Sequence, residues 1–94
     1  MSQVHCMKRW TVDILLSEET DEESARTWAE AGLTIDGETN VRGHGMARKN
    51  PTDIDVPEIG DELAVSRALA DLARRLRQVA AEDITESTGV MWRG

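Results

Sequence analysis

Histidine and cysteine, the side chains that most often bind zinc or act as bases and nucleophiles, are scarce in this chain of 94 residues. They are His5, Cys6 and His44. A zinc site usually needs four protein ligands, or three plus a water molecule, and a nucleophile needs a base and an orienting acid nearby. His5 and Cys6 lie in a stretch without hydrophobic pattern, so no element holds them near His44. We therefore expect no metal ion, no cofactor and no catalytic residue, and the lone cysteine excludes an internal disulfide.

A run of acids is the second group that could do chemistry: Asp53, Asp55, Glu58, Asp61 and Glu62. A calcium loop places oxygen ligands at alternate positions, bends at a glycine and closes with a bidentate glutamate. Here Pro57 and apolar residues such as Ile54 and Val56 interrupt that pattern. Turn formation and the positive end of a helix dipole explain the acids more simply. A small-ligand or metal site in the acidic segment 53–62 is the third hypothesis for this chain.

Arginines in the second half of the chain form the third group, because guanidinium groups bind phosphates. They are Arg67, Arg74, Arg75 and Arg77. The whole chain, however, has 11 basic and 18 acidic residues and a net charge of −7, which repels nucleic acids and anionic membranes. A simpler interpretation is a solvated helix face with ion pairs such as that between Asp71 and Arg75, four residues apart.

The sequence shows no membrane span or targeting signal. No apolar run approaches the roughly 18–20 residues that cross a bilayer, and residues 1–9 lack the apolar core of a signal peptide. One cysteine fits a reducing compartment. We expect a cytoplasmic protein without membrane contact, and the sequence leaves open whether Met1 or Met7 is the native start.

Three segments alternate between apolar and polar residues, which is the period of a half-buried strand. They cover residues 8–16, 26–36 and 41–49, and the acidic run 17–24 is predicted to be a loop or wide turn. The residues expected on the core face are Trp10, Val12, Ile14 and Leu16, then Ala29, Ala31, Leu33 and Ile35, and then Val41, Gly43, Gly45 and Ala47. Two glycines and an alanine leave the core face of the third strand with almost no side chains, so a helix can approach that strand closely.

The turn signal Asp-Gly at 36–37 joins the second and third strands in a hairpin. A two-residue loop would pair Leu33 with Asn40 and turn the charged residues of the third strand toward the core. A three- or five-residue loop would pair Leu33 with Val41 or Gly43 and keep charge out of the core. Because a shift of one residue exchanges the two faces of a strand, we predict an odd loop.

Beyond Pro57 the apolar residues recur at spacings of four and three, which indicates one amphipathic helix. The apolar stripe consists of Val65, Leu69, Leu72, Leu76 and Val79. Pro57 suits a first helical turn, and Glu58 suits the positive end of the dipole. We expect this helix to end at about Ile84 or Glu86.

These elements predict one α+β domain, in which a three-stranded antiparallel sheet packs on one long C-terminal helix in the order β-β-β-α. The domain would cover residues 8–88, with a flexible N-terminal arm at 1–7 and a C-terminal tail at 89–94. A chain this short buries only roughly 60–65% of its unfolded surface. The core should therefore be thin, and a second copy could bury a face that one domain cannot cover.

Several strings of the chain carry a family resemblance. They are RWTVDI at residues 9–14, VRGHGMAR at 41–48, and NPTDIDVPEIGDELA at 50–64, followed by RALADLA. In combination they resemble an actinobacterial family of small uncharacterised proteins, domain of unknown function 1876, over residues 8–88. The resemblance implies a fold like that of double-stranded-RNA-binding domains with the first helix missing. The family has no established activity, so the resemblance implies no catalytic residues.

The implied fold makes nucleic-acid binding the second hypothesis. Readers of double-stranded RNA place basic residues at the start of the last helix, whereas residues 57–62 here read PEIGDE. These acids would repel phosphate, and the missing first helix removes a contact surface. Because fold does not imply function, we favour an interpretation without nucleic-acid binding.

The first hypothesis is a non-enzymatic cytoplasmic protein that associates with itself. If the helix covers the core faces named above, the opposite face of the sheet stays open. The residues predicted there as an interface are Leu15, Trp28, Arg42, His44, Met46 and Arg48. Tryptophan, methionine and arginine are typical of interface anchors, although an ordinary solvated face is the alternative. A free strand edge offers a second route to a homo-oligomer, a dimer or larger.

Overall fold

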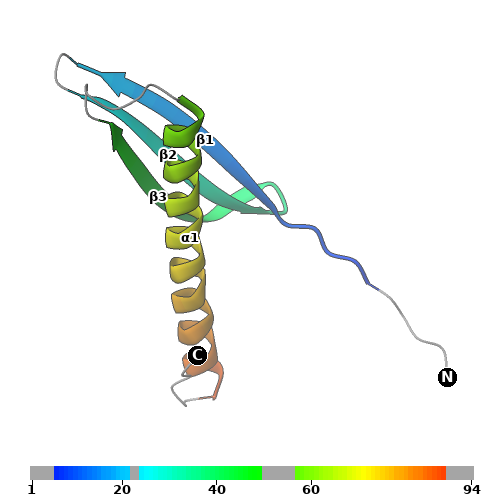
Figure 1. The fold of residues 1–94 in the computed structure, drawn as a ribbon. Coiled ribbons are helices and arrows are strands. Elements are labelled where there is room, and N and C mark those ends of the chain that lie inside the picture. Colours follow the sequence, from blue (N-terminus) through cyan, green and yellow to red (C-terminus); the bar gives the residue numbers. More distant parts are fainter. Residues whose placement is uncertain (1–5, 22–23, 50–56, 89–94) are drawn as a thin grey trace.

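The computed structural model describes residues 6–21, 24–49 and 57–88 of the chain. Three strands precede one long helix: β1 (Thr11–Thr20), β2 (Ala25–Ile35), β3 (Glu38–Lys49) and α1 (Pro57–Thr88). The strands form an antiparallel sheet in the order β1-β2-β3, and α1 lies across one face of it (Figure 1). The predicted α+β fold is confirmed. The expected tail, 89–94, and most of the expected arm lie outside the described residues.

β1 continues four residues beyond the segment that its alternation predicted. Residues 17–20 pair with residues 25–28 of β2, so the prediction of a loop there is wrong. These four residues lie on an edge strand and are exposed, so their polar side chains stay in water. Their backbone groups meanwhile gain partners in β2. The polar side chains of residues 17–20 therefore did not indicate where β1 ends.

The turn between β2 and β3 has two residues, Asp36 and Gly37, with φ angles of 53° and 82°. Two positive φ angles in succession fit a type I′ turn. The predicted odd loop is therefore wrong, yet one of the two pairings predicted for Leu33, that with Val41, is confirmed. A β-bulge at Asn40 reconciles the two, because the pairing shifts by one residue beside Leu33. The bulge returns the charged residues of β3 to the face opposite the core.

α1 rests nearly backbone to backbone on β3, at Gly43 and Gly45. A Cβ atom at Gly43 would collide with backbone atoms of Ala68 and Leu72. One at Gly45 would collide with backbone atoms of Ala64 and Ala68. The close approach predicted from the bare face of this strand is confirmed.

The core is small and consists mainly of alanine. Its buried members are Ala29, Ala31, Leu33, Ala47, Ala64, Ala68 and Leu72, and the partly buried side chains packed against them are Ile14, Ile35, Val41, Val65 and Leu76. Only Ile14 of these belongs to β1. α1 contacts β3 and β2 extensively and β1 only slightly, and its C-terminal half extends past the sheet (Figure 1).

β1 is therefore left uncovered on the helix side, which corrects the predicted core. Trp10, Val12 and Leu16 were expected beneath the helix, but all three are exposed. Strands lie about 4.8 Å apart, so three of them form a wider face than one helix of about 10 Å diameter covers. The glycines draw α1 over β3, and the uncovered remainder falls on β1.

Candidate association surface

The six residues predicted as an interface lie together on the face of the sheet that α1 leaves open. They are Leu15, Trp28, Arg42, His44, Met46 and Arg48, and the strand pairings place all of them opposite the helix side. Leu15 is 70% exposed and Trp28 43%. Trp28 pairs directly with Met46 across β2 and β3. The sequence therefore identified the members of this face correctly.

Charged groups on the open face pair with one another within the chain. Arg42 Nε lies 2.9 Å from Glu30 Oε1, and His44 Nε2 lies 3.9 Å from Glu30 Oε2. The side chains of Arg42 and His44 are largely exposed and that of Glu30 is half-buried, and ion pairs so accessible to water contribute little to stability. The open face is thus a mixture of three apolar side chains, Leu15, Trp28 and Met46, and a charged cluster centred on Glu30.

A second, more apolar surface lies on the helix side of the sheet and was missed by the sequence reasoning. Val12 and Leu16 of β1 lie on that side, Leu69 of α1 flanks it, and Trp10 precedes β1 in the same sequence alternation; they are 42%, 44%, 42% and 54% exposed. We call these four residues the β1 strip. Their side chains carry no ionisable group, and the two from β1 are paired with Leu33 and Ala29 of the core. Comparing the widths of one helix and three strands could have predicted the strip.

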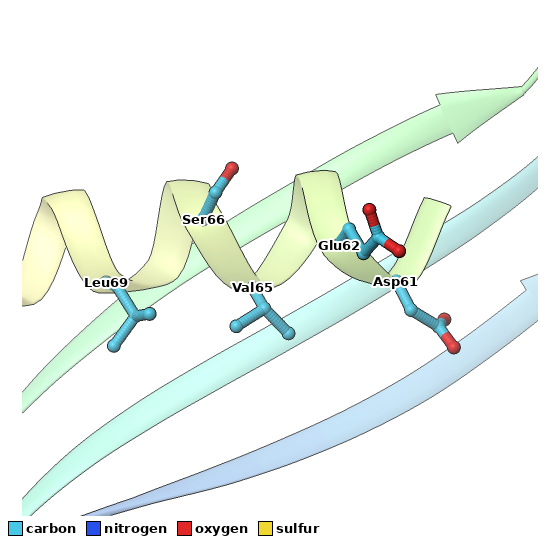
Figure 2. Close-up of a pocket in the computed structure, with 5 residues that line it drawn as sticks. All are labelled: Asp61, Glu62, Val65, Ser66 and Leu69. Atoms are coloured by element: carbon cyan, nitrogen blue, oxygen red, sulfur yellow. The ribbon is translucent and has the colours of Figure 1, made fainter. Parts of the chain in front are cut away.

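A shallow groove runs along the flank of α1 beside the β1 strip. Its lining residues are Asp61, Glu62, Val65, Ser66 and Leu69. Figure 2 shows Asp61, Val65 and Leu69 pointing toward the side of the sheet where β2 and β1 lie. These five lining residues all come from one helix, so within the described ranges no second element forms an opposing wall, as the walls of a small-molecule pocket would. The groove continues the exposed apolar surface of the strip.

The described residues give the metal hypothesis no support. No three histidine, cysteine, aspartate or glutamate side chains among them are grouped as a metal ion would need. Glu58 and Glu62 of the acidic segment are exposed on the first turns of α1, whereas Asp53 and Asp55 lie outside the described residues. Within the same ranges, no helix combines the length and apolar character required to cross a membrane.

Asp71 of α1 accepts three hydrogen bonds and ties the helix to the edge of β3. The backbone N–H of His44 donates to its Oδ2 at 2.9 Å. Arg74 Nη2 donates to Oδ1 at 2.7 Å and Arg75 Nε to Oδ2 at 2.9 Å. The His44 N–H, followed by Arg74 and Arg75, holds the pKa of Asp71 well below its usual range. The predicted pair of Asp71 with Arg75 is confirmed, and the bond to β3 is an addition to it.

These bonds also bear on nucleic-acid binding. Arg67 Nη1 donates to the Met46 carbonyl at 2.7 Å, so three of the four helix arginines bond to groups of the chain itself. Phosphate binding would have to compete with these partners. The described contacts therefore add to the unfavourable net charge of −7.

Asp71→Asn is expected to lower the melting temperature at neutral pH and to weaken the loss of stability in acid. The pKa of Asp71 is depressed in the fold, so its carboxylate stabilises the folded state fully at pH values above the ordinary pKa of 3.8. That stabilisation is lost as the pH falls from there through the lower folded value. Melting curves of both proteins between neutral pH and strong acid check this, with Glu82→Gln, an exposed carboxyl on the projecting half of α1, as the control. Parallel curves for wild type and Asp71→Asn would contradict the role assigned to Asp71.

Comparison with known proteins gives the same architecture in a solved structure. The crystal structure of Rv2632c covers 92% of this chain and 96% of its own, with a TM-score of 0.75 and 43% sequence identity. The uncharacterized protein Rv2632c of Mycobacterium tuberculosis H37Rv is 46% identical over 84 residues, which are 89% of this chain and 85% of that protein. The uncharacterized protein Mb1767 of Mycobacterium bovis is likewise 46% identical over 84 residues, 89% of this chain and 84% of that protein.

None of these names states a reaction, a ligand or a partner. The predicted membership in a family of uncharacterised actinobacterial proteins is confirmed. The sequence pattern of the Rv2632c-like family matches residues 8–93, nearly the whole chain. The chain therefore belongs to the Rv2632c-like family.

Proposed function

We propose that the chain is a non-enzymatic cytoplasmic protein that works as a self-associating module, with a second copy of the chain bound along β1. The observation that carries this proposal is the exposure of β1. Ile14 is its only residue that is even partly buried, although Val12, Leu15 and Leu16 are apolar. A strand so little covered by its own domain is a surface that a partner can cover.

The thin core supports the proposal energetically. Five of the seven buried core residues are alanines, so folding buries little apolar area. Each Å² of apolar surface removed from water contributes roughly 25 cal/mol. Chains near this size gain stability by association because a single domain buries so small a fraction of its surface. Covering the β1 strip in a dimer would supply area that the monomer lacks.

The chemistry of the two surfaces favours the β1 strip over the open face. The centres of interfaces are depleted in charged residues. On the open face, a partner would have to remove water from Glu30, Arg42 and His44, which is costly for charged groups. The strip carries no such groups. The predicted open-face interface of Leu15, Trp28, Arg42, His44, Met46 and Arg48 is the competing proposal, and it is testable separately.

A likeness to double-stranded-RNA-binding domains without their first helix would account for the exposed strip. A sheet that has one helix fewer on a face keeps part of that face uncovered. On this proposal, a second copy of the chain covers what another helix would otherwise cover. Nucleic-acid binding need not follow from such a likeness.

Leu16→Ser and Trp28→Ser test the proposal as a matched pair. Each replaces one half-exposed apolar side chain by serine, one on the helix side of the sheet and one on the open face. Leu16→Ser is expected to raise the dimer Kd by about 30-fold or more, because the change occurs twice per dimer. Trp28→Ser should leave the Kd within about threefold of wild type. Sedimentation velocity over a series of concentrations measures both, and circular dichroism verifies that each variant is folded.

The three outcomes separate the competing surfaces. Weakening by Leu16→Ser alone supports the β1 strip. Weakening by Trp28→Ser alone would move the interface to the open face and overturn the choice of surface. A wild-type chain that sediments as a monomer at every concentration would reject self-association altogether.

A further inference from the structure

One edge of the sheet is already occupied by α1. The His44 N–H donates to Asp71 Oδ2 at 2.9 Å, and the Met46 carbonyl accepts from Arg67 Nη1 at 2.7 Å. Both backbone groups belong to β3, the edge strand opposite β1. Another strand could pair with β3 there only by displacing these two side chains. In the described part of the chain, β1 is therefore the edge that leaves room for an added strand.

The same contacts reveal which backbone groups of β1 point out of the sheet. In an antiparallel ladder, the N–H and C=O of one residue point to one neighbouring strand, and those of the next residue point the other way. The backbone N–H and C=O of His44 point away from β2, so those of its cross-strand partner Glu30 point toward β1. There Glu30 pairs with Leu15, whose backbone groups therefore point back toward β2. The backbone groups of Ile14 and Leu16 consequently point out of the sheet at the edge of β1. These are the groups that a new strand would bind.

The charges along β1 favour one direction of pairing. Lys8 and Arg9 precede the strand, and Glu18 and Glu19 lie near its end. Antiparallel pairing of two copies brings the basic end of each against the acidic end of the other, whereas parallel pairing places like charges side by side. We infer, building on the self-association proposed above, that two copies join antiparallel along their β1 strands about a two-fold axis.

The side chains also select the register of this pairing. Apolar residues of both copies stay on the helix side only if even-numbered residues of β1 face even-numbered residues. With Asp13 on the axis, two carboxylates would face each other, which is destabilising. With Ile14 on the axis, Arg9 of each copy faces Glu19 of the other. The register centred on Ile14 satisfies both conditions.

The resulting dimer has one continuous sheet of six strands, three from each copy. An axis between antiparallel strands stands perpendicular to the sheet, so both α1 helices lie on the same face. The two β1 strips then meet side by side between the helices and form one apolar surface. Lateral contacts across the axis bury part of each strip, which is how the pairing stabilises the dimer.

Charge reversal at the two ends of β1 tests the inferred pairing. Arg9→Glu alone places two acids opposite each other at both ends, and Glu19→Arg alone places two arginines there. Each single variant is expected to dimerise roughly 10- to 30-fold more weakly than wild type at low salt. An equimolar mixture of the two variants is expected to form a heterodimer of wild-type affinity, because both end pairs are again of opposite charge. Sedimentation velocity with one variant fluorescently labelled measures the three affinities.

The controls keep this test separate from that of the proposed function. Melting temperatures close to wild type show that each variant is folded. A wild-type dimer whose affinity neither reversal changes, or whose variants do not recover on mixing, would overturn the antiparallel pairing while self-association stands. A monomeric wild type would instead reject the proposed function itself.

Amide hydrogen exchange gives an independent readout that needs no substitution. In the dimer, the outward N–H groups of Val12, Ile14 and Leu16 are hydrogen-bonded and should exchange slowly. Dilution below the Kd should make these amides exchange fast, while the inward N–H of Leu15 remains protected. Fast exchange of all three outward amides at concentrations where the chain is dimeric would contradict edge pairing.

Discussion

A Gly45→Ala variant is expected to lose about 3 kcal/mol or more of unfolding free energy. An added Cβ atom would collide with backbone atoms of Ala64 and Ala68, which cannot rotate away as the end of a side chain can. α1 would have to lift from β3, and the core between them would open. Because a small domain has only about 5–10 kcal/mol of stability in total, combining this change with Gly43→Ala should leave the chain unfolded at room temperature.

Gly32→Ala is the matched control for this prediction. Its added Cβ atom would lie 3.1 Å from the Thr39 Cγ2 atom, the movable end of an exposed side chain. We expect a change within about 0.5 kcal/mol of wild type. Urea unfolding followed by circular dichroism at one protein concentration compares all the variants. Wild-type stability of Gly45→Ala would show that α1 does not rest backbone to backbone on β3.

Leu72→Ala is expected to have the second largest effect, a loss of about 3 kcal/mol. Leu72 and Leu33 are the only buried core residues larger than alanine in the described part of the chain. Removing the side chain of Leu72 leaves a cavity between α1 and the sheet, and the surrounding alanines are too small to fill it. Thermal and urea unfolding measure the loss.

Leu15→Ala deletes the same atoms at a position that is 70% exposed. It should change the unfolding free energy by no more than about 0.5 kcal/mol. Equal losses for the two variants would mean that the small core between α1 and the sheet is not the main source of stability.

Sequence periodicity predicted the elements and their faces well. The alternation in β2 and β3 identified which residues lie opposite the helix. Keeping charge out of the core narrowed the partner of Leu33 to Val41 or Gly43, and the structure has Val41. The spacing of leucines located α1 from Pro57 onward, although the observed helix continues to Thr88. These features depend on local patterns, which a single sequence carries.

The position of α1 on the sheet could not be read from local patterns. The alternation of β1 states which side chains share a face but not whether another element covers that face. Coverage depends on the bare surface at Gly43 and Gly45, which draws the helix toward β3 and away from Trp10 and Val12. The bulge at Asn40 could not be predicted for a similar reason. It restores the register after a two-residue turn through the backbone alone, so no side-chain pattern indicates it.

The bonds between α1 and the edge of β3 were likewise beyond the sequence. Helical spacing predicts that Asp71 meets Arg75, and the structure has this pair at 2.9 Å. Nothing in that spacing indicates that the same carboxylate accepts the N–H of His44, which is 27 residues away in the chain. That contact places a side chain of α1 on the edge of β3, so among the described residues β1 is the edge without such a contact.

Sedimentation equilibrium of the unmodified chain tests the central claim of self-association most directly. Over a roughly hundredfold range of concentration, the weight-average mass is predicted to rise from one chain to two, as mass action requires. A mass that stays at one chain over the whole range would contradict the claim that a second copy covers β1.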